Sequence, residues 1–323
     1  MNLGKVRNEV KYLTVQYFCK EKGWSIRWMC QQLNISKAAY YKWLHRKIPK
    51  AEQENILLAQ LIQEYDEQYN HILGYRRMTE WINIFNTTNF SKNRIHRIMK
   101  IINVHSVIRK QPKKHRKSTP ERTAENILKR DFNASKPNEK WVTDVTEFKW
   151  SNGTETKKLY LSAILDLYDR TVVSSVISRR NDNRLVFNTF NKAIADNPQA
   201  APIFHSDRGF QYTSPMFQNK LQAQGMQQSM SRVGHCIDNG PTEGFGGIIK
   251  SEMYYLNTFK DEQSLRTAIE KYIHFYNYER FQSRFGVRTP MQVRKDALAA
   301  DSPIVYPIPE NKRIKKYKEK FAA

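Results

Sequence analysis

Apolar residues recur at helical spacing over much of the chain from Gly23 to Lys100. From Gly23 onward they divide into two short helices separated by Asn34 and Ile35, with Ser25 and Ser36 placed as N-caps. Two short helices at this spacing are typical of a helix-turn-helix. The side chains that this pattern leaves free to enter a DNA groove are those of Lys37, Tyr41, Lys42 and His45.

A similar arrangement follows a longer amphipathic helix over residues 51–69. It begins with GYRRM at residues 74–78, and Ser91 is placed to cap its second helix. The apolar residues of that helix share one face, which leaves its arginines outward. We therefore expect a second DNA-binding region, whose basic side chains are Arg76, Arg77, Arg94 and Arg97.

The second half of the chain alternates extended and helical patterns. Residues 141–150, 158–166 and 171–178 are rich in β-branched and aromatic residues and are separated by polar turns, which predicts three consecutive antiparallel strands. After them we expect a helix over 182–196, a strand over 201–206, a helix over 215–224, a strand over 226–230 and a final helix. This order predicts an α/β fold with a mixed five-stranded sheet flanked by helices, as in a ribonuclease-H-like domain.

Charge is distributed unevenly along the chain. The 323 residues contain 54 Lys and Arg against 31 Asp and Glu, a net charge of +23. Residues 1–136 hold 27 of the basic and 11 of the acidic residues, so this part carries +16 and residues 137–323 carry +7. A surplus of this size indicates a polyanionic partner, and double-stranded DNA fits the helix-turn-helix patterns.

A basic, proline-containing stretch without large apolar residues, residues 109–120, is typical of a linker. It is either a solvated tether or a strap that settles on phosphates through Lys113, Lys114 and Arg116. A second basic run, residues 311–320, leaves the same two choices. We therefore expect a helix-turn-helix region (1–50), a second helical DNA-binding region (51–108), a basic linker (109–136), a ribonuclease-H-like catalytic core (137–295) and a basic C-terminal tail (296–323).

Membrane and disulfide-stabilised proteins do not fit the composition. No window approaches the roughly 18 uncharged apolar residues of a membrane span, and the first residues lack the apolar core of a signal peptide. Cys19, Cys30 and Cys236 are widely separated and form no CxxC pattern, which argues against a disulfide framework or a cysteine-rich zinc site. We expect a protein of the reducing cytoplasm.

An acidic residue lies inside the first predicted strand of the second half. Asp144 has apolar or β-branched neighbours on both sides, a position that is unfavourable unless the carboxylate is paired or binds a cation. Asp207 directly follows the fourth strand, which neighbours the first in this topology. Glu243 lies on the helix after the fifth strand, 36 positions beyond Asp207. Three converging carboxylates predict a hard-oxygen site for two Mg2+ ions that take phosphate oxygens as further ligands.

Other acidic residues have more ordinary explanations. Glu147 has the opposite side parity within the first strand, which indicates a solvated position. Asp166 and Asp169 border a turn, where Asp is common for backbone reasons. Asp238 competes with Glu243 for the third place, but the Asp-Asn-Gly-Pro sequence that it opens is typical of the turn that begins a helix.

Three motifs carry a family resemblance. They are WVTDVTEF at residues 141–148, FHSDRGFQYTS at 204–214 and SRVGHCIDNGPTEGFGGIIKSEMYY at 231–255. With 35 residues between Asp207 and Glu243, the chain resembles the catalytic OrfB half of insertion-sequence transposases of the IS3 family, within the DDE transposase and retroviral integrase superfamily. The resemblance covers roughly residues 10–295 and includes the segments at 74–78 and 272–293.

The resemblance implies a DDE polynucleotidyl transferase that cleaves and joins DNA strands at the terminal inverted repeats of a mobile element. Asp144, Asp207 and Glu243 are then the catalytic and metal-binding residues, with two Mg2+ ions that Mn2+ can replace. Lys250, two helical turns beyond Glu243, is expected to hold a phosphate of the DNA end. The implied partners are terminal-repeat and target DNA, further copies of the chain, and an OrfA portion supplied by fusion or in trans. The implied location is the bacterial cytoplasm, at the nucleoid.

One residue departs from the family pattern. Where the family usually has a bulky aromatic residue three positions after the glutamate, this chain has Gly246, and Gly244 and Gly247 crowd the same helix. Each interior glycine costs a helix about 1 kcal/mol relative to alanine, so we expect a weakly ordered helix unless Gly246 serves a close backbone approach. Two alternatives stay open: a DNA-binding regulator with an inactive integrase-like core, for which Gly246 is the best support, and a simple nuclease without strand transfer.

Overall fold

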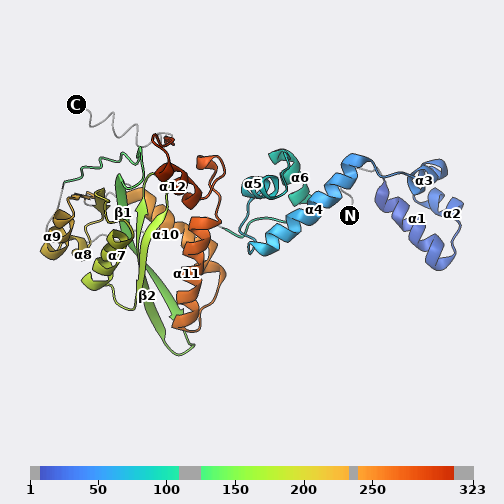
Figure 1. Ribbon diagram of the computed structural model, residues 1–323. Coiled ribbons are helices and arrows are strands. Elements are labelled where there is room, and N and C mark those ends of the chain that lie inside the picture. Colours follow the sequence, from blue (N-terminus) through green and yellow to red (C-terminus); the bar gives the residue numbers. More distant parts are fainter. Residues whose placement is uncertain (1–7, 109–124, 233–238, 309–323) are drawn as a thin grey trace. The chain divides into compact units, whose positions relative to one another are not determined.

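The computed structural model describes residues 8–108, 125–232 and 239–308 (Figure 1). It divides into two compact units, Met1–Val107 and Ile108–Ala323. Within the described ranges, we find no helix with both the length and the apolarity that a membrane crossing needs. Predicted features that lie outside the described residues are Lys113, Lys114, Arg116, Cys236, Asp238 and the basic run 311–320.

The described part of the first unit is helical throughout. Its helices are α1 (Glu9–Lys22), α2 (Ile26–Gln32), α3 (Lys37–Leu44), α4 (Lys50–Gln68), α5 (Tyr75–Phe85) and α6 (Lys92–Ile101). Helices α1 to α3 pack around Val15, Met29 and Tyr40. The two predicted helices are confirmed as α2 and α3, and Ser36 caps α3 by accepting the N–H of Ala39.

Helices α4, α5 and α6 pack on one another. They bury large side chains that include Ile62, Trp81 and Ile98. Ser91 caps α6, because its hydroxyl accepts the N–H of Arg94 at 3.3 Å. The predicted long helix and the helix after Ser91 are therefore confirmed.

The second unit is built on a single mixed sheet. Its strands are β1 (Lys140–Ser151), β2 (Thr156–Asp166), β3 (Val172–Ser178), β4 (Ile203–Ser206) and β5 (Gln227–Met230). They lie in the order β3-β2-β1-β4-β5, with β1, β2 and β3 antiparallel and with β4 and β5 parallel to β1. This is the predicted five-stranded arrangement, and β1 lies at its centre.

Helices cover both faces of this sheet (Figure 1). They are α7 (Asn183–Asp196), α8 (Phe210–Thr213), α9 (Pro215–Ala223), α10 (Gly240–Glu252), α11 (Glu262–Tyr278) and α12 (Pro290–Ala299), with 3-10 turns η2 (Tyr254–Leu256) and η3 (Ser283–Phe285). Because side chains alternate along a strand, Trp141 packs with α7 and α9, whereas Val142 and Phe148 pack with α10 and α11. The predicted ribonuclease-H-like layering is thus present.

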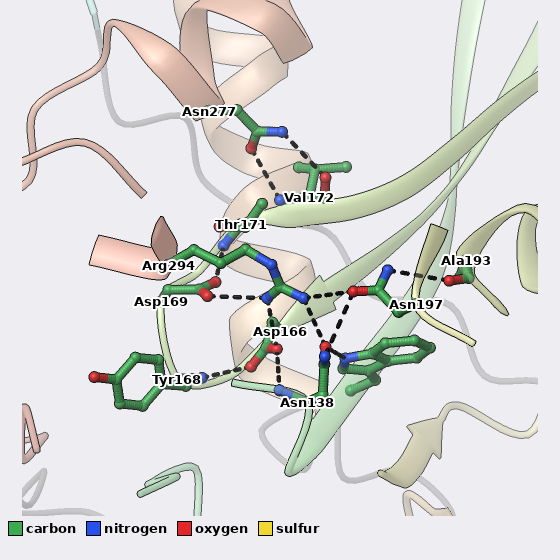
Figure 2. Close-up of polar contacts among 11 residues, drawn as sticks. Asn138, Asp166, Tyr168, Asp169, Thr171, Val172, Ala193, Asn197, Asn277 and Arg294 are labelled. Carbon is green, nitrogen blue, oxygen red and sulfur yellow. Dashed lines mark hydrogen bonds and ion pairs between the residues drawn. The ribbon is translucent and has the colours of Figure 1, made fainter. Parts of the chain in front are cut away.

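An arginine from α12 is buried where β2 turns into β3 (Figure 2). Nη1 of Arg294 donates to Asp166 at 2.9 Å and to Asp169 at 3.0 Å, and Nη2 donates to Asn138 at 2.6 Å and Asn197 at 2.9 Å. Both aspartates also accept backbone N–H groups of the turn, as predicted. The interpretation of Asp166 and Asp169 as ordinary turn residues is nevertheless incomplete, because they are fully buried and hold the guanidinium.

Candidate active site

The sheet brings Asp144 and Asp207 to the same level on neighbouring strands. Val142 of β1 pairs with His205 of the parallel strand β4, and each carboxylate follows its paired residue by two positions. Asp144 shares its side parity with Val142 and Phe148, so it belongs to the face covered by α10. The register therefore sets Asp144 and Asp207 at the same end of two neighbouring strands.

Negative charge is concentrated around Asp144. Burial raises the pKa of its carboxyl from the ordinary 3.8 to about 7, and the charges of Asp207 and Glu243 add to the rise. The N–H of Val145, donated to Asp144 at 2.8 Å, and the charge of Lys250 act in the opposite direction. Burial also raises the pKa of Asp207. The backbone N–H of Gly209, which donates to its carboxylate at 2.9 Å, acts in the opposite direction. The charges of Asp207 and Glu243 are therefore both felt at Asp144.

Helix α10 supplies the remaining predicted groups. Glu243 lies in its first turn and Lys250 in its last. The Nζ of Lys250 lies 5.7 Å from the centre of the Phe148 ring on β1, so the lysine faces the sheet. Burial lowers the pKa of Lys250, and the attraction of Asp144 and Glu147 opposes that effect.

The start of α10 is tied to β1 by Asn239, a contact that the sequence did not predict. Its Nδ2 donates to the backbone oxygen of Thr143 at 3.1 Å, and its own backbone oxygen accepts the hydroxyl of Thr242 at 3.0 Å. Asn239 is buried and lies one helical turn before Glu243, whereas Thr143 adjoins Asp144. The bond therefore ties the first turn of α10, which carries Glu243, to the part of β1 that carries Asp144. The Asn-Gly-Pro sequence indicated the helix start but not this partner.

Glu147 does not join the carboxylates. It is half-buried and forms an ion pair with Lys158 of β2 at 3.0 Å. Its side parity is opposite to that of Asp144, as predicted, and its charge already has a partner on its own face.

Carboxylate oxygens are the kind of ligand that a hard divalent cation prefers. Across the described ranges, no group of three or more His, Cys, Asp or Glu side chains is already arranged to hold a metal ion. The donor set is nevertheless three carboxylates, which are the ligands that Mg2+ takes. The raised pKa of Asp144 also reflects an excess of negative charge that a cation would offset.

The predicted DNA-contacting residues of the first unit fall into two groups. Those exposed are Lys37, Lys42, Arg76 and Arg97. Arg77 donates to the backbone oxygen of Ile72 at 2.7 Å. Arg94 donates to Asn55 at 2.9 Å and pairs with Glu54 at 3.1 Å, both on α4. The prediction that Arg94 points outward is therefore wrong, because its side chain turns from α6 toward α4 and pairs with Glu54 there.

Gly246 lies against the sheet. A Cβ built on it would stand 3.0 Å from Oγ1 of Thr146 on β1, whereas Cβ atoms on Gly244 and Gly247 would meet nothing within 4 Å. The structure thus favours the close-approach interpretation of Gly246. A bulky aromatic side chain at this position would need Thr146 to move.

This contrast predicts different outcomes for two alanine substitutions. Gly247→Ala should raise the free energy of unfolding by about 0.5–1 kcal/mol, because alanine loses less backbone entropy in a helix. Gly246→Ala should raise the free energy of unfolding by less than Gly247→Ala does, or lower it, because its methyl group meets Thr146. Urea unfolding of both variants measures the difference. Equal stabilisation by the two would show that the contact with Thr146 is not limiting.

Comparisons with known proteins identify family matches and relatives of the chain. Residues 134–236 and residues 243–298 each match the family described as integrase core domain, and residues 52–112 match the HTH-like domain. Over 222 residues the chain is 38% identical to the putative transposase InsK for insertion sequence element IS150 of Escherichia coli (strain K12), covering 68% of this chain and 77% of that protein. It is 28% identical to the transposase InsF for insertion sequence IS3A of the same strain, covering 90% of this chain and all of that protein.

Two further similarities complete the comparison. An uncharacterized transposase-like protein of Haemophilus influenzae is 37% identical over 212 residues, which are 66% of this chain and 96% of that protein. Among solved structures, the chain is similar to the HTLV-2 integrase catalytic core domain in complex with magnesium. The match covers 49% of this chain and 97% of that one, with 24% identity and a TM-score of 0.38.

Proposed function

This chain belongs to the IS3 family of insertion-sequence transposases, and we propose that Asp144, Asp207 and Glu243 are the catalytic carboxylates of its DNA strand cleavage and strand transfer. The observation that carries the proposal is the parallel register of β1 and β4, which sets Asp144 level with Asp207. The influence of Glu243 on the pKa of Asp144 supports the third assignment.

The three carboxylates would hold two Mg2+ ions, for which Mn2+ can substitute. Bound divalent ions lower the pKa of an attacking water or DNA 3′ hydroxyl and stabilise the charge on the leaving oxygen. The protein's own contribution would be positional: β1 and β4 would hold two carboxylates, and the bond from Asn239 to β1 would steady the helix that carries the third. In each step an oxygen attacks a phosphodiester in line, and the departing 3′ oxygen takes up a proton.

Lys250 would contact a phosphate of the bound DNA end. It shares the α10 face of Glu243 and lies against Phe148. A partly dehydrated ammonium interacts more strongly with a phosphate than a fully hydrated one does. Lys250 would then hold a positive charge near the carboxylates, where we expect the scissile strand to lie.

The first unit would supply most of the affinity for DNA. We assign contacts with the terminal repeats to the exposed side chains Lys37, Lys42, Arg76 and Arg97, and to the linker residues Lys113, Lys114 and Arg116. Since two element ends and a target have to be joined, the working form would be an oligomer on DNA, in the bacterial cytoplasm at the nucleoid. An OrfA portion would act by fusion or in trans.

Charge removal on α3 tests the first of these contacts. Lys37→Gln with Lys42→Gln should weaken binding to terminal-repeat duplexes and lower the slope of log Kd against log salt by roughly 0.9 for each phosphate that is no longer neutralised. Arg94→Gln is the matched comparison, because that arginine pairs with α4. Unchanged affinity and slope in the double variant would remove α3 from the interface.

The activity itself is tested with short duplexes that carry the element's own terminal repeats. We expect 3′-end cleavage and joining with Mg2+ or Mn2+, and none after chelation with EDTA, while binding persists. Cleavage that survives EDTA would contradict the metal assignment. Specific binding without cleavage under any of these conditions would favour the regulator with an inactive core.

A further inference from the structure

Arg170 occupies the tight turn between β2 and β3 in a left-handed conformation, with φ of 64°. Its backbone N–H donates to the oxygen of Asp166 at 3.0 Å. Its guanidinium, by contrast, forms no hydrogen bond or ion pair with any residue that the structure describes. Burial lowers the pKa of this side chain, so a positive charge sits here with too little water around it.

A second arginine without a carboxylate partner lies beside this turn. Arg284, in η3, donates from Nη2 to the backbone oxygen of Tyr306 at 2.7 Å, and the ring of Tyr306 lies 6.3 Å from that of Tyr168 in the turn. Nε of Arg284 and Nε2 of Gln282 are buried donors that find no acceptor among the described residues. Burial and the charge of Arg170 lower the pKa of Arg284 to about 10.

The other arginines of this region have carboxylate partners. Arg280 forms two bonds with Glu252, at 2.9 and 3.0 Å, and Arg288 pairs with Asp296. Arg294 forms ion pairs with both buried aspartates of the turn, Asp166 and Asp169 (Figure 2). Those aspartates attract Arg170 from a distance, but their oxygens are already bonded to Arg294 and to backbone N–H groups.

We propose that Arg170 and Arg284 form a binding site for a backbone phosphate of DNA, separate from the carboxylates, with Gln282 as an additional donor. The proposal rests on the proposed function, since it takes DNA as the ligand. Two half-buried guanidinium groups that are not bonded to any carboxylate are costly, and the phosphate of a bound strand would supply the missing acceptor oxygens. The guanidinium fork matches phosphate oxygens in two-point contacts, and partial burial strengthens each bond.

The position suits a contact outside the reacting centre. The turn adjoins the first residue of β1, because the N–H of Leu167 donates to the oxygen of Lys140 at 2.9 Å. Asp144 lies four residues further along the strand, which is about 13 Å at the usual rise. Asp207 follows the opposite end of the parallel strand β4. A phosphate held here would therefore anchor DNA beyond the strand that reacts.

The sign of a stability change separates this site from a structural role. Arg170→Asn, which keeps a residue that tolerates the left-handed turn, and Arg284→Gln should each leave the DNA-free melting temperature unchanged or raise it by roughly 2–4 °C. In the wild type, inorganic phosphate at constant ionic strength should raise the melting temperature and saturate. Neither variant should show that saturable rise. Arg179→Gln, which removes an exposed charge paired with Glu262, is the matched control and should respond as the wild type does.

DNA binding tests the ligand. Each variant of the full chain should bind terminal-repeat duplex roughly tenfold more weakly, the change expected for one charged hydrogen-bonded contact, with a salt slope smaller by about 0.9. A fall in melting temperature with unchanged DNA affinity would overturn the proposal in favour of internal structural arginines. A phosphate response with unchanged DNA affinity would overturn it in favour of a free-anion site. Cleavage by the wild type, and its loss in Glu243→Gln, test the proposed function separately, so the two failures can be told apart.

Discussion

Asp144→Asn, Asp207→Asn and Glu243→Gln should each reduce DNA cleavage and joining by roughly a thousandfold or more, because each removes an oxygen ligand worth several kcal/mol in the transition state. Binding to the terminal repeats should stay within a few-fold of the wild type. Gel assays of 3′-end cleavage and strand transfer, beside a Kd for the same duplex, measure the two quantities.

The same substitution at Asp144 should stabilise the metal-free protein. The folded state raises the pKa of this carboxyl from 3.8 to about 7, so it binds more protons than the unfolded state between those values. The free energy of unfolding therefore falls as pH rises from about 4 to about 7, and the cost is fully present above that range. Asp144→Asn removes the ionisation, so its melting temperature should exceed that of the wild type at pH 8 and match it more closely at pH 4.

Glu147→Gln is the matched control for these variants. It removes one carboxylate from the same strand, but one that is paired with Lys158 on the other face. It should keep most of the strand-transfer activity. Near-normal strand transfer in Asp144→Asn, Asp207→Asn or Glu243→Gln would show that the residue concerned is wrongly assigned.

Local pattern predicted the elements that place the carboxylates, since alternation and turn residues are properties of neighbouring positions. Asp144 and Asp207 could be placed because strand order alone brings β1 beside β4. The bond between Asn239 and Thr143 could not, because it joins residues 96 positions apart and nothing local to either identifies the other. The sequence does not predict helix α1, because Tyr12 and Val15 are its only buried residues, whereas Val10 and Leu13 are exposed.

Charged residues were the harder part of the sequence to interpret. The spacing of α6 placed Arg94 outward, but a long side chain can fold back, and Glu54 and Asn55 on α4 hold it. Asp166 lies 128 positions from Arg294, so its burial as an ion pair depends on tertiary packing alone. The sequence showed only the turn that these acids also cap.

Arg294→Met should be the most destabilising single change in the second unit, at about 3–5 kcal/mol, because removing one partner leaves a buried charge uncompensated. Asp166 and Asp169 are fully buried, and even with Arg294 present, burial and the charge of Asp166 raise the pKa of Asp169 to about 7. Without the guanidinium, the side-chain oxygens of Asn138 and Asn197 each lose one donor and keep only the longer bonds from Trp141 and from Asn138. Urea unfolding at pH 7.5 measures the decrease in stability.

Two comparisons show whether the decrease arises from buried charge. Arg288→Met removes a partly exposed arginine paired with Asp296, so it should cost less than about 1 kcal/mol. Arg294→Met with Asp166→Asn and Asp169→Asn should recover part of the stability, since neutral amides no longer leave an unpaired charge. A decrease of under about 1 kcal/mol in Arg294→Met, or no recovery in the triple variant, would mean that α12 is held by its apolar contacts through Val293 and Ala297 and not by the buried ion pairs.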